Sequence, residues 1–346
     1  MTLVNLYSDT QTRPTAAMRE AMAAAEVGDE QSFADPTVNT LCERVAELLG
    51  FEAAVFLPSG TMCNAIAFRL HVGPAGDEAY LHRRSHPIVA EAGGPAALSG
   101  AVLCPLDGER GMFTADALRA VLRPAGDRYL PRSRLVSVEQ TTNLAGGHVW
   151  PREQLNEVVA VARDAGLRLH MDGARLMNAV VASGMSAASW ADGFDTAWVD
   201  FSKGLGAPVG ACLAGSRALV DEAWRYKQMW GGAMRQAGIV AAGALHALDH
   251  HVDRLADDHA LAAELARGLA VVPGVTLDPA AVTTNIVVFE VADAPALVAA
   301  LAERDVKMGA LGPRTVRAVT HLDVDADGVA RAIEAVGSAL APAPAR

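Results

Sequence analysis

Short apolar runs alternate with amphipathic stretches over the first two thirds of the chain. Apolar runs bounded by turn residues predict buried strands at 53–57, 135–139, 167–172, 196–201 and 210–214. Apolar residues at helical spacing, such as Val38, Leu41 and Val45, predict helices between the strands, at 14–25, 36–49, 62–71, 152–165 and 174–183. Strands that alternate with helices in this way indicate an α/β fold with a mostly parallel central sheet covered by helices.

The pattern changes from about residue 237. A long helical stretch runs to residue 270, and a strand at 284–290, a helix at 294–304, two strands near 306–311 and 316–320 and a last helix follow. This order is typical of a smaller α+β domain. We therefore expect an N-terminal segment (1–12) packing on the small domain, a large domain (13–240) and a small C-terminal domain (241–346).

Composition narrows the classes of function. The 346 residues are 51% hydrophobic and carry a formal net charge of −11 without a long basic run, which argues against a nucleic-acid partner or an anionic membrane surface. We expect no signal peptide, because the first residues lack a charged n-region and a long apolar core, and no apolar run in the sequence is long enough to span a membrane. Four scattered cysteines without a CxxC pair favour reduced thiols and a cytoplasmic location. His246 and His250 have the spacing of metal ligands but no HExxH motif, so we expect no metal site.

One lysine stands out at the mouth of a predicted buried strand. Lys203 follows the run Trp198 to Phe201 and precedes a turn with three glycines and a proline. Burying an ammonium is costly, and one reason to place it there is an imine with a carbonyl cofactor or substrate. A loop lysine after a strand, or an anion-binding glycine turn, fits the same residues.

Two other strand ends carry candidate chemistry. Ser59, Gly60 and Thr61 lie between a strand and a helix, where free N–H groups and two hydroxyls form an anion site; a simple helix cap is the alternative. Asp172 ends the strand at 167–172 and is suited either to pair with a protonated ring nitrogen or to cap the next helix. Ligands of parallel sheets bind beyond the carboxyl ends of the strands, where Ser59, Asp172 and Lys203 all fall.

Together these residues resemble the pyridoxal-phosphate (PLP) enzymes of the aspartate aminotransferase-like class, the PLP-dependent transferase-like fold type I. Nearly the whole chain closely resembles the low-specificity threonine aldolases of the β-eliminating lyase group. The matching stretches are Ser8-Asp-Thr10, Ala16-Ala-Met18, Ala21-Met22, Val27-Gly-Asp29, Asp35-Pro-Thr-Val-Asn39, Pro58-Ser-Gly-Thr61, His86, Glu91-Ala-Gly-Gly94, His170-Met-Asp-Gly-Ala-Arg175, Ser202-Lys-Gly-Leu-Gly-Ala-Pro-Val-Gly210, Met234-Arg-Gln-Ala-Gly238 and Val316-Arg-Ala-Val-Thr-His-Leu-Asp-Val324.

The resemblance implies a role for each candidate residue. Lys203 forms the Schiff base with PLP, Asp172 pairs with the pyridine nitrogen, and the ring serves as an electron sink. Cofactor contacts are further implied for Ser59, Gly60, Thr61, Arg175 and Arg235; for Arg235, a contact made from a neighbouring subunit is one option. His86 stacks on the ring and is the candidate for handling the proton of the substrate hydroxyl. Ser8, Arg175 and Arg317 resemble a substrate carboxylate clamp, since a guanidinium binds a carboxylate bidentately.

The implied activity is cleavage of β-hydroxy-α-amino acids to glycine and an aldehyde, in a homotetramer whose subunits share active sites. Three positions depart from the family pattern around the substrate: Thr142 replaces a histidine, Ser32 replaces a tyrosine, and Gln228 stands where a basic residue is usual, with Lys227 adjacent. These departures leave open β-elimination or transamination on the same scaffold. A non-enzymatic protein that binds a phosphate ligand is the remaining alternative.

Overall fold

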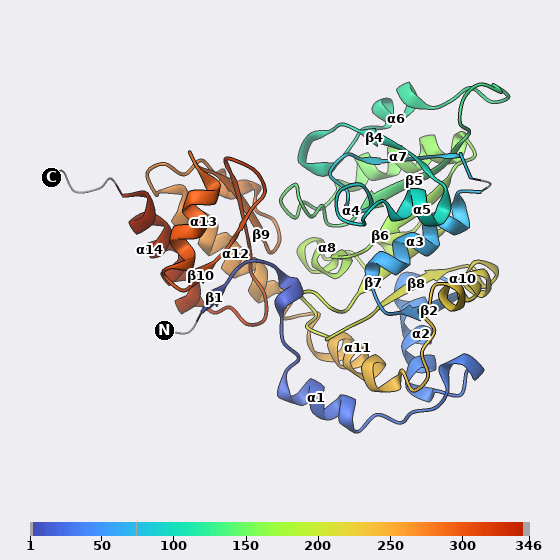
Figure 1. The fold of residues 1–346 in the computed structure, drawn as a ribbon, viewed down its shortest axis with the longest axis horizontal. Coiled ribbons are helices and arrows are strands. Elements are labelled where there is room, and N and C mark those ends of the chain that lie inside the picture. The colour runs from blue at the N-terminus through green and yellow to red at the C-terminus, as the bar shows by residue number, and fades with distance from the viewer. Residues whose placement is uncertain (1–2, 74, 342–346) are drawn as a thin grey trace.

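The structure is a computed structural model that describes residues 3–73 and 75–341. Its centre is a seven-stranded sheet in the order β2-β8-β7-β6-β5-β3-β4 (Figure 1). The strands of this sheet are β2 (Ala53–Leu57), β3 (Glu78–His82), β4 (Val102–Leu106), β5 (Ser133–Glu139), β6 (Arg168–Asp172), β7 (Thr196–Asp200) and β8 (Ala211–Gly215).

The directions of the strands decide where a ligand site forms. Neighbouring strands in the series β7-β6-β5-β3-β4 are all parallel. Strand β8 runs antiparallel to both β7 and β2. Because β8 is antiparallel to both of its neighbours, β2 runs in the same direction as β7 and the other parallel strands. The carboxyl ends of β2, β5, β6 and β7 therefore meet at one edge, and the predicted mostly parallel α/β sheet is confirmed.

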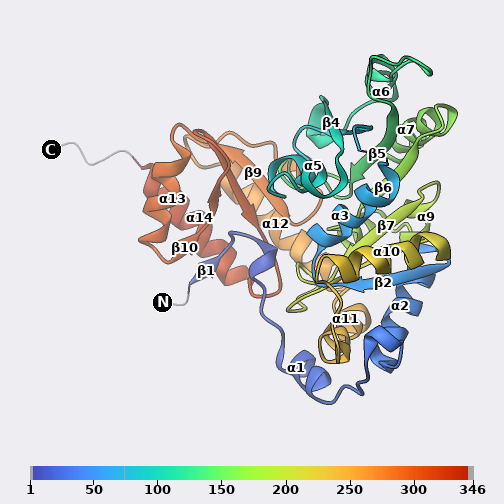
Figure 2. The same ribbon diagram turned by 45° about the vertical axis from the view of Figure 1, so that its right-hand side comes forward.

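Helices cover the sheet on both faces (Figures 1 and 2). Asp35 caps α2, since its Oδ1 accepts a hydrogen bond of 3.0 Å from the N–H of Val38. No helix within the described residues has both the length and the apolar character needed to cross a membrane. The helices up to residue 250 are α1 (Ala16–Ala23), α2 (Pro36–Leu49), α3 (Gly60–His71), α4 (His86–Val89), α5 (Gly94–Ser99), α6 (Ala115–Val121), α7 (Arg152–Asp164), α8 (Leu176–Ser183), α9 (Ala187–Ala191), α10 (Arg217–Met229) and α11 (Gly238–His250).

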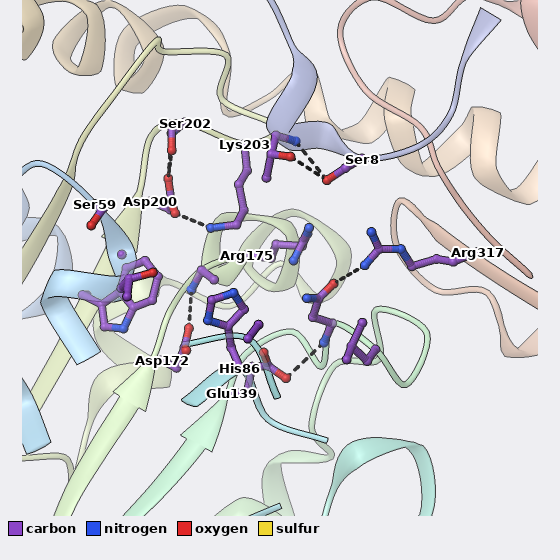
Figure 3. A pocket seen from close by; sticks show the side chains of 18 of the residues that line it. Ser8, Ser59, His86, Glu139, Asp172, Arg175, Asp200, Ser202, Lys203 and Arg317 are labelled. Atoms are coloured by element: carbon purple, nitrogen blue, oxygen red, sulfur yellow. Dashed lines mark hydrogen bonds and ion pairs between the residues drawn. The ribbon is translucent and has the colours of Figure 1, made fainter. Parts of the chain in front are cut away.

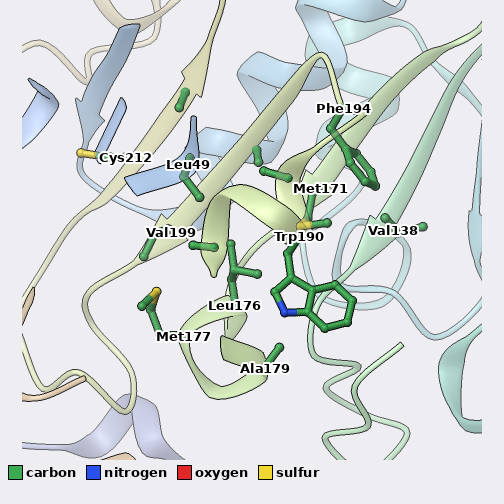
Figure 4. Close-up of a cluster of buried hydrophobic side chains, with 14 of the residues drawn as sticks. Leu49, Val138, Met171, Leu176, Met177, Ala179, Trp190, Phe194, Val199 and Cys212 are labelled. Atoms are coloured by element: carbon green, nitrogen blue, oxygen red, sulfur yellow. The ribbon is translucent and has the colours of Figure 1, made fainter. Parts of the chain in front are cut away.

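The main hydrophobic core lies between the sheet and the helices that follow its strands. Met171 of β6 and Val199 of β7 pack in one cluster with Leu176 of α8 and Trp190 of α9 (Figure 4). These side chains are at most 1% exposed. Burial of a large apolar side chain stabilises the fold by about 2 kcal/mol, so this cluster holds the ends of β6 and β7 rigidly.

The sequence pattern did not predict β3 and β4. Strand β3 begins with Glu78 and ends with His82, both buried, which breaks the apolar run expected of an inner strand. Glu78 is tolerated there because it accepts hydrogen bonds from Arg123 and from the hydroxyl of Tyr80, at 2.9 and 2.7 Å. Strand β4 is the sheet edge and contains Pro105, so its pattern is also weak.

A second, smaller core forms around residues 262–336 together with Val4 and Leu6. The N-terminal strand pairs in parallel with β10, with Val4 opposite Val306. The N-terminal strand thus lies against the small body; the division into domains, with limits at residues 12 and 240, stays a prediction. The remaining elements are β1 (Val4–Asn5), α12 (Leu255–Ala270), β9 (Ile286–Glu290), α13 (Ala294–Ala302), β10 (Val306–Lys307), β11 (Gly309–Ala310), β12 (Thr315–Val319) and α14 (Ala326–Leu340).

The prediction of a single long helix over residues 237–270 is wrong. Helix α11 ends at His250 and α12 begins at Leu255. Between them, His251 is buried and its Nδ1 donates to the carbonyl oxygen of Leu205, at 2.7 Å. This inward bond fixes the turn beside the glycine-rich loop, a tertiary contact that helical periodicity does not encode.

Candidate active site

A cavity of about 450 Å³ opens at the carboxyl edge of the sheet (Figure 3). The ends of β2, β5, β6 and β7 form its floor, and the N-terminal segment and β12 of the small body close one side. The structure brings nine predicted site residues into its wall: Ser8, Ser59, Gly60, Thr61, His86, Asp172, Arg175, Lys203 and Arg317.

Lys203 lies in the turn after β7 and reaches into the cavity. Its Nζ is bonded to the carboxylate of Asp200, the last residue of β7. Asp200 also accepts two hydrogen bonds of 2.7 Å from the backbone N–H and the hydroxyl of Ser202. The lysine is therefore a paired cation at the cavity wall, and Asp200 is a cavity residue that the sequence analysis did not single out.

The Ser59–Gly60–Thr61 turn begins α3 as predicted. The Ser59 hydroxyl caps the helix by accepting from the N–H of Met62 at 3.2 Å. A Cβ at Gly60 would lie 2.2 Å from the ring of Trp198, so only glycine fits between the helix start and this ring. The free N–H groups of the first turn face the cavity and form a site for an anion.

Asp172 ends β6 beside this turn and is 1% exposed. Its Oδ1 accepts from the N–H of Ala174 at 3.1 Å, and its Oδ2 accepts from Nδ2 of Asn64 at 2.8 Å. Gly173 next to it leaves room for the backbone of β7, because a Cβ there would lie 1.7 Å from the Trp198 carbonyl oxygen. The carboxylate is thus held from both sides while it lines the cavity.

His86, at the start of α4, faces the carboxylates on the cavity floor (Figure 3). Its Nδ1 donates to Oε1 of the buried Glu91 at 2.8 Å. That hydrogen bond raises the pKa of His86 above its ordinary value, against the opposing effect of partial burial. The other ring nitrogen, Nε2, is left for a ligand.

Arg175 lies in the wall with two of its nitrogens committed. Nε and Nη2 bind Asp9 at 2.8 and 2.6 Å, and both side chains are almost fully buried. Burial raises the pKa of Asp9, but the charge and hydrogen bonds of Arg175 outweigh it and leave that pKa at about 2. The pair fastens the N-terminal segment to the start of α8.

Arg317 of β12 enters the cavity from the small body. Its Nη1 donates to Oδ1 of Asn143 at 2.8 Å, and its Nη2 donates to the carbonyl oxygen of Tyr7 at 3.3 Å. Nε is buried without a partner, and no carboxylate among the described residues forms an ion pair with this guanidinium. Burial, with the nearby charge of Arg175, lowers the pKa of Arg317. An anionic ligand would complete this site.

Glu139, at the end of β5, is another acidic side chain of the cavity wall that the sequence analysis did not assign. It lines the cavity and accepts from the N–H of Asn143 at 3.1 Å. Burial, strengthened by the charge of Asp172, raises its pKa to about 8. Glu139 is therefore a group that exchanges a proton in the neutral to mildly alkaline range.

Three predicted residues lie away from the cavity of their own chain. The Thr142 hydroxyl accepts from the N–H of His148 at 3.1 Å, and the side chain is buried outside the cavity wall. The Ser32 hydroxyl donates to the carbonyl oxygen of Asp29, and Arg235 pairs with the Asp29 carboxylate at 2.9 Å; neither Ser32 nor Arg235 lines the cavity. Thr142 is thus turned away, whereas Ser32 and Arg235 form one neighbouring group.

The acidic residues that the sequence analysis missed carried unequal signals. Asp200 lies three residues before Lys203, so helical or turn spacing could have suggested the pair. Asp9 belongs to a matching stretch of the resemblance, but nothing local connects it to Arg175. Glu139 ends a predicted strand at the same edge as Asp172, which was a usable signal.

Comparisons with known proteins identify the family of the chain. The family model for beta-eliminating lyases matches residues 5–292. The low specificity L-threonine aldolase of Escherichia coli (strain K12) is 40% identical over 331 residues, covering 95% of this chain and 96% of that protein.

Solved structures extend the comparison of the fold. The threonine aldolase of Leishmania major superposes with a TM-score of 0.84 at 20% identity, over 97% of this chain and 99% of that one. A structure described as SPT with PLP superposes with a TM-score of 0.74 at 17% identity, over 97% and 87% of the two chains. These likenesses concern the fold alone; the family model and the 40% identical relative establish that the chain belongs to the beta-eliminating lyase family.

Proposed function

We propose that this protein is a PLP-dependent aldehyde-lyase that cleaves β-hydroxy-α-amino acids of the threonine and allo-threonine type to glycine and an aldehyde. The family match and the 40% identical threonine aldolase support the reaction. The observation that carries the proposal is that one cavity contains both a primary amine, Lys203, and a guanidinium, Arg317, that pairs with no carboxylate among the described residues.

The cavity residues fit PLP. The start of α3 offers N–H donors to a phosphate, and Gly60 is held against Trp198 so that no side chain obstructs the turn. Asp172 would pair with the pyridine nitrogen and Lys203 would supply the amine that joins the carbonyl carbon. When bound, PLP supplies an electron sink for the electron pair released as the Cα–Cβ bond breaks.

The chain's own residues then bind and orient the substrate. Arg317 would take the substrate carboxylate, with the Ser8 hydroxyl beside it, and Arg175 would support this position while it holds Asp9. His86 would receive the proton of the substrate β-hydroxyl at Nε2, because Nδ1 is occupied by Glu91. Fixing the carboxylate decides which bond to Cα is cleaved, which favours retro-aldol cleavage over transamination.

Purified protein supplied with PLP tests the activity directly. Threonine, allo-threonine and phenylserine are incubated separately, and glycine is measured together with the aldehyde. We expect glycine from at least one of them, and Lys203→Ala should abolish both glycine and the borohydride-reducible absorbance of the bound cofactor. Ammonia and a keto acid in place of glycine would instead support β-elimination, and no product at all would contradict an enzymatic role.

We further propose a homotetramer in which subunits share active sites. Ser32 and Arg235 lie together outside the cavity of their own chain, beside Phe33, which is 62% exposed. In the tetramer, Ser32 and Arg235 of one subunit would lie beside Lys203 of a neighbouring subunit. Light scattering measures the mass, and mixing Lys203→Ala with Arg235→Ala subunits should restore activity if sites are shared.

The four free cysteines support the expected cytoplasmic location.

A further inference from the structure

One buried amide joins the acidic groups of the site. Asn64, on α3, donates from Nδ2 to Oδ2 of Asp172 at 2.8 Å and to Oε1 of Glu91 at 2.7 Å. Its Oδ1 lies 2.9 Å from Nε1 of Trp198 and 3.1 Å from Nε2 of His170. Asn64 is 1% exposed, and among the described residues these four bonds use both hydrogens of Nδ2 and both lone pairs of Oδ1.

The orientation of this amide is determined by its neighbours. The indole N–H of Trp198 is only a donor, so it requires the oxygen of Asn64. The carboxylates of Asp172 and Glu91 are acceptors, so they require the NH₂ group. Each carboxylate therefore receives one of the two hydrogens of Nδ2.

The same donor and acceptor rules determine which atom donates in each hydrogen bond of the series, or donor chain, that leads to Asn64. Nε2 of His170 must donate, because Oδ1 of Asn64 is an acceptor only. Burial lowers the pKa of His170 well below its ordinary value, so the ring is neutral and its Nδ1 accepts from the Thr196 hydroxyl at 2.8 Å. That hydroxyl has a single hydrogen, so Nε2 of His71 donates to it, also at 2.8 Å.

All hydrogens in this chain point toward the cofactor side. His71 is the last residue of α3, and Asn64 lies in the middle of the same helix. His170 and Thr196 are register partners on β6 and β7, so the sheet holds them side by side. Successive donors polarise one another, and a bond that ends on a charged acceptor is strengthened most.

We infer that Asn64 is a positioning residue for the cofactor, and that the donor chain His71–Thr196–His170–Asn64 aims the Asp172 carboxylate into the cavity. Through its second hydrogen, Asn64 also holds Glu91 and thereby His86. The inference rests on the proposed pairing of Asp172 with the pyridine nitrogen. It means that Thr196 and His71, which do not line the cavity, act on the protonation of a ring that they do not touch.

Four variants test the chain. Asn64→Leu removes the amide, Thr196→Val removes only the hydroxyl with little change of shape, and Thr196→Ser restores it. Asn178→Leu is the matched control, because Asn178 is also buried and its Nδ2 bonds a histidine, His259, at 3.1 Å without touching Asp172 or Glu91. Two readouts are taken on each protein: the dissociation constant of PLP, and the ¹⁵N NMR signal of bound PLP labelled at the ring nitrogen.

We expect Asn64→Leu to weaken PLP binding about tenfold or more, as for the loss of a hydrogen bond to a charged group. Its ¹⁵N signal should move toward that of an unprotonated pyridine. Thr196→Val should shift both readouts in the same direction by a smaller amount, and Thr196→Ser should return them to wild type. The Thr196 pair keeps the test valid if Asn64→Leu does not fold.

Two results would overturn the inference. One is a wild-type ¹⁵N signal and affinity in both Asn64→Leu and Thr196→Val. The other is an equal loss in Asn178→Leu, which would mean that any buried amide has this effect. Failure of the wild-type protein to bind PLP would overturn the proposed function as well, so the two failures are distinguishable.

Discussion

The Nζ of Lys203 is bonded to the carboxylate of Asp200, three residues earlier in the chain (Figure 3). Asp200 ends β7, and its Oδ2 lies 3.1 Å from the position of a Cβ on Gly60, at the start of the proposed phosphate site. One carboxylate thus borders both the lysine and the anion site. It stabilises the free lysine as a cation, but it also opposes a phosphate.

Replacing Asp200 with asparagine removes the negative charge and keeps the size of the side chain. We expect PLP to bind about fivefold more tightly to Asp200→Asn, because a partly screened repulsion of ~1 kcal/mol is relieved. Absorbance titration of cofactor-free protein measures the change. Asp192→Asn, at an exposed position, is the control and should bind as wild type. Weaker binding in Asp200→Asn would show that pairing with Lys203 outweighs the repulsion.

How much of the site could be predicted depended on whether its determinants are local. Asp35 and Ser59 were recognisable as caps, and Lys203 and Asp172 as strand-end residues, because each signal lies within a few neighbouring positions. The Asp9–Arg175 pair joins residues 166 positions apart, and no periodicity reports it.

The direction of the Thr142 side chain and the presence of strand β3 could not be predicted from the sequence either. Thr142 is adjacent in sequence to Asn143, which lines the cavity, yet Thr142 points to the backbone of His148. Strand β3 carries Glu78 in an inner position because Arg123 pairs with it from a distant helix end. Both outcomes depend on tertiary partners, which hydrophobic patterning alone does not specify.

Arg317 and Arg314 form a natural pair of variants for the substrate carboxylate. Arg317 lines the cavity and pairs with no carboxylate in the part of the chain that the structure describes, whereas Arg314 is 67% exposed and 3.7 Å from Glu290. We expect Arg317→Ala to raise KM for threonine by about 10- to 100-fold, as for loss of a charge-assisted bond of 1.5–3 kcal/mol. Arg314→Ala should leave KM within about twofold. Steady-state kinetics decide, and equal effects at the two positions would remove Arg317 from the clamp.

Asp9 should link stability to acidic pH. Its pKa is lowered to about 2 in the folded protein from an ordinary value of 3.8, so the stability it contributes is complete above about pH 4 and is lost as pH falls toward 2. Asp9→Ala leaves Arg175 buried without a counter-ion and should cost about 3 kcal/mol at pH 7. Urea unfolding at pH 7 and pH 3 measures this. Asp323→Ala, near the N-terminal segment but not fully buried, serves as control; an equal cost there would contradict the role of the pair.

Glu91 should set the pH at which His86 becomes a base. Because the hydrogen bond to Glu91 raises the pKa of His86, the ring stays protonated to higher pH and kcat/KM should rise as pH climbs through that pKa. Glu91→Gln weakens the hydrogen bond that stabilises the protonated ring of His86, so the acidic limb of the pH profile of kcat/KM should move to lower pH. The profile of Glu109→Gln, at an exposed position, should not move. An unmoved limb in Glu91→Gln would make His86 a stacking wall alone.

Glu139 should make the cofactor-free protein less stable as pH rises. Its pKa is about 8 when folded against an ordinary 4.5, so between these values the folded state binds more protons than the unfolded state, and stability falls with increasing pH. Glu139→Gln removes the charge that must be buried, and its advantage over wild type should grow from near zero at pH 5 to on the order of a few kcal/mol at pH 9. Thermal unfolding across this range measures the difference, with the exposed Glu157→Gln as control. Parallel stability curves for Glu139→Gln and wild type would show that Glu139 ionises without cost, in which case it cannot be the group that holds a proton at the cavity floor.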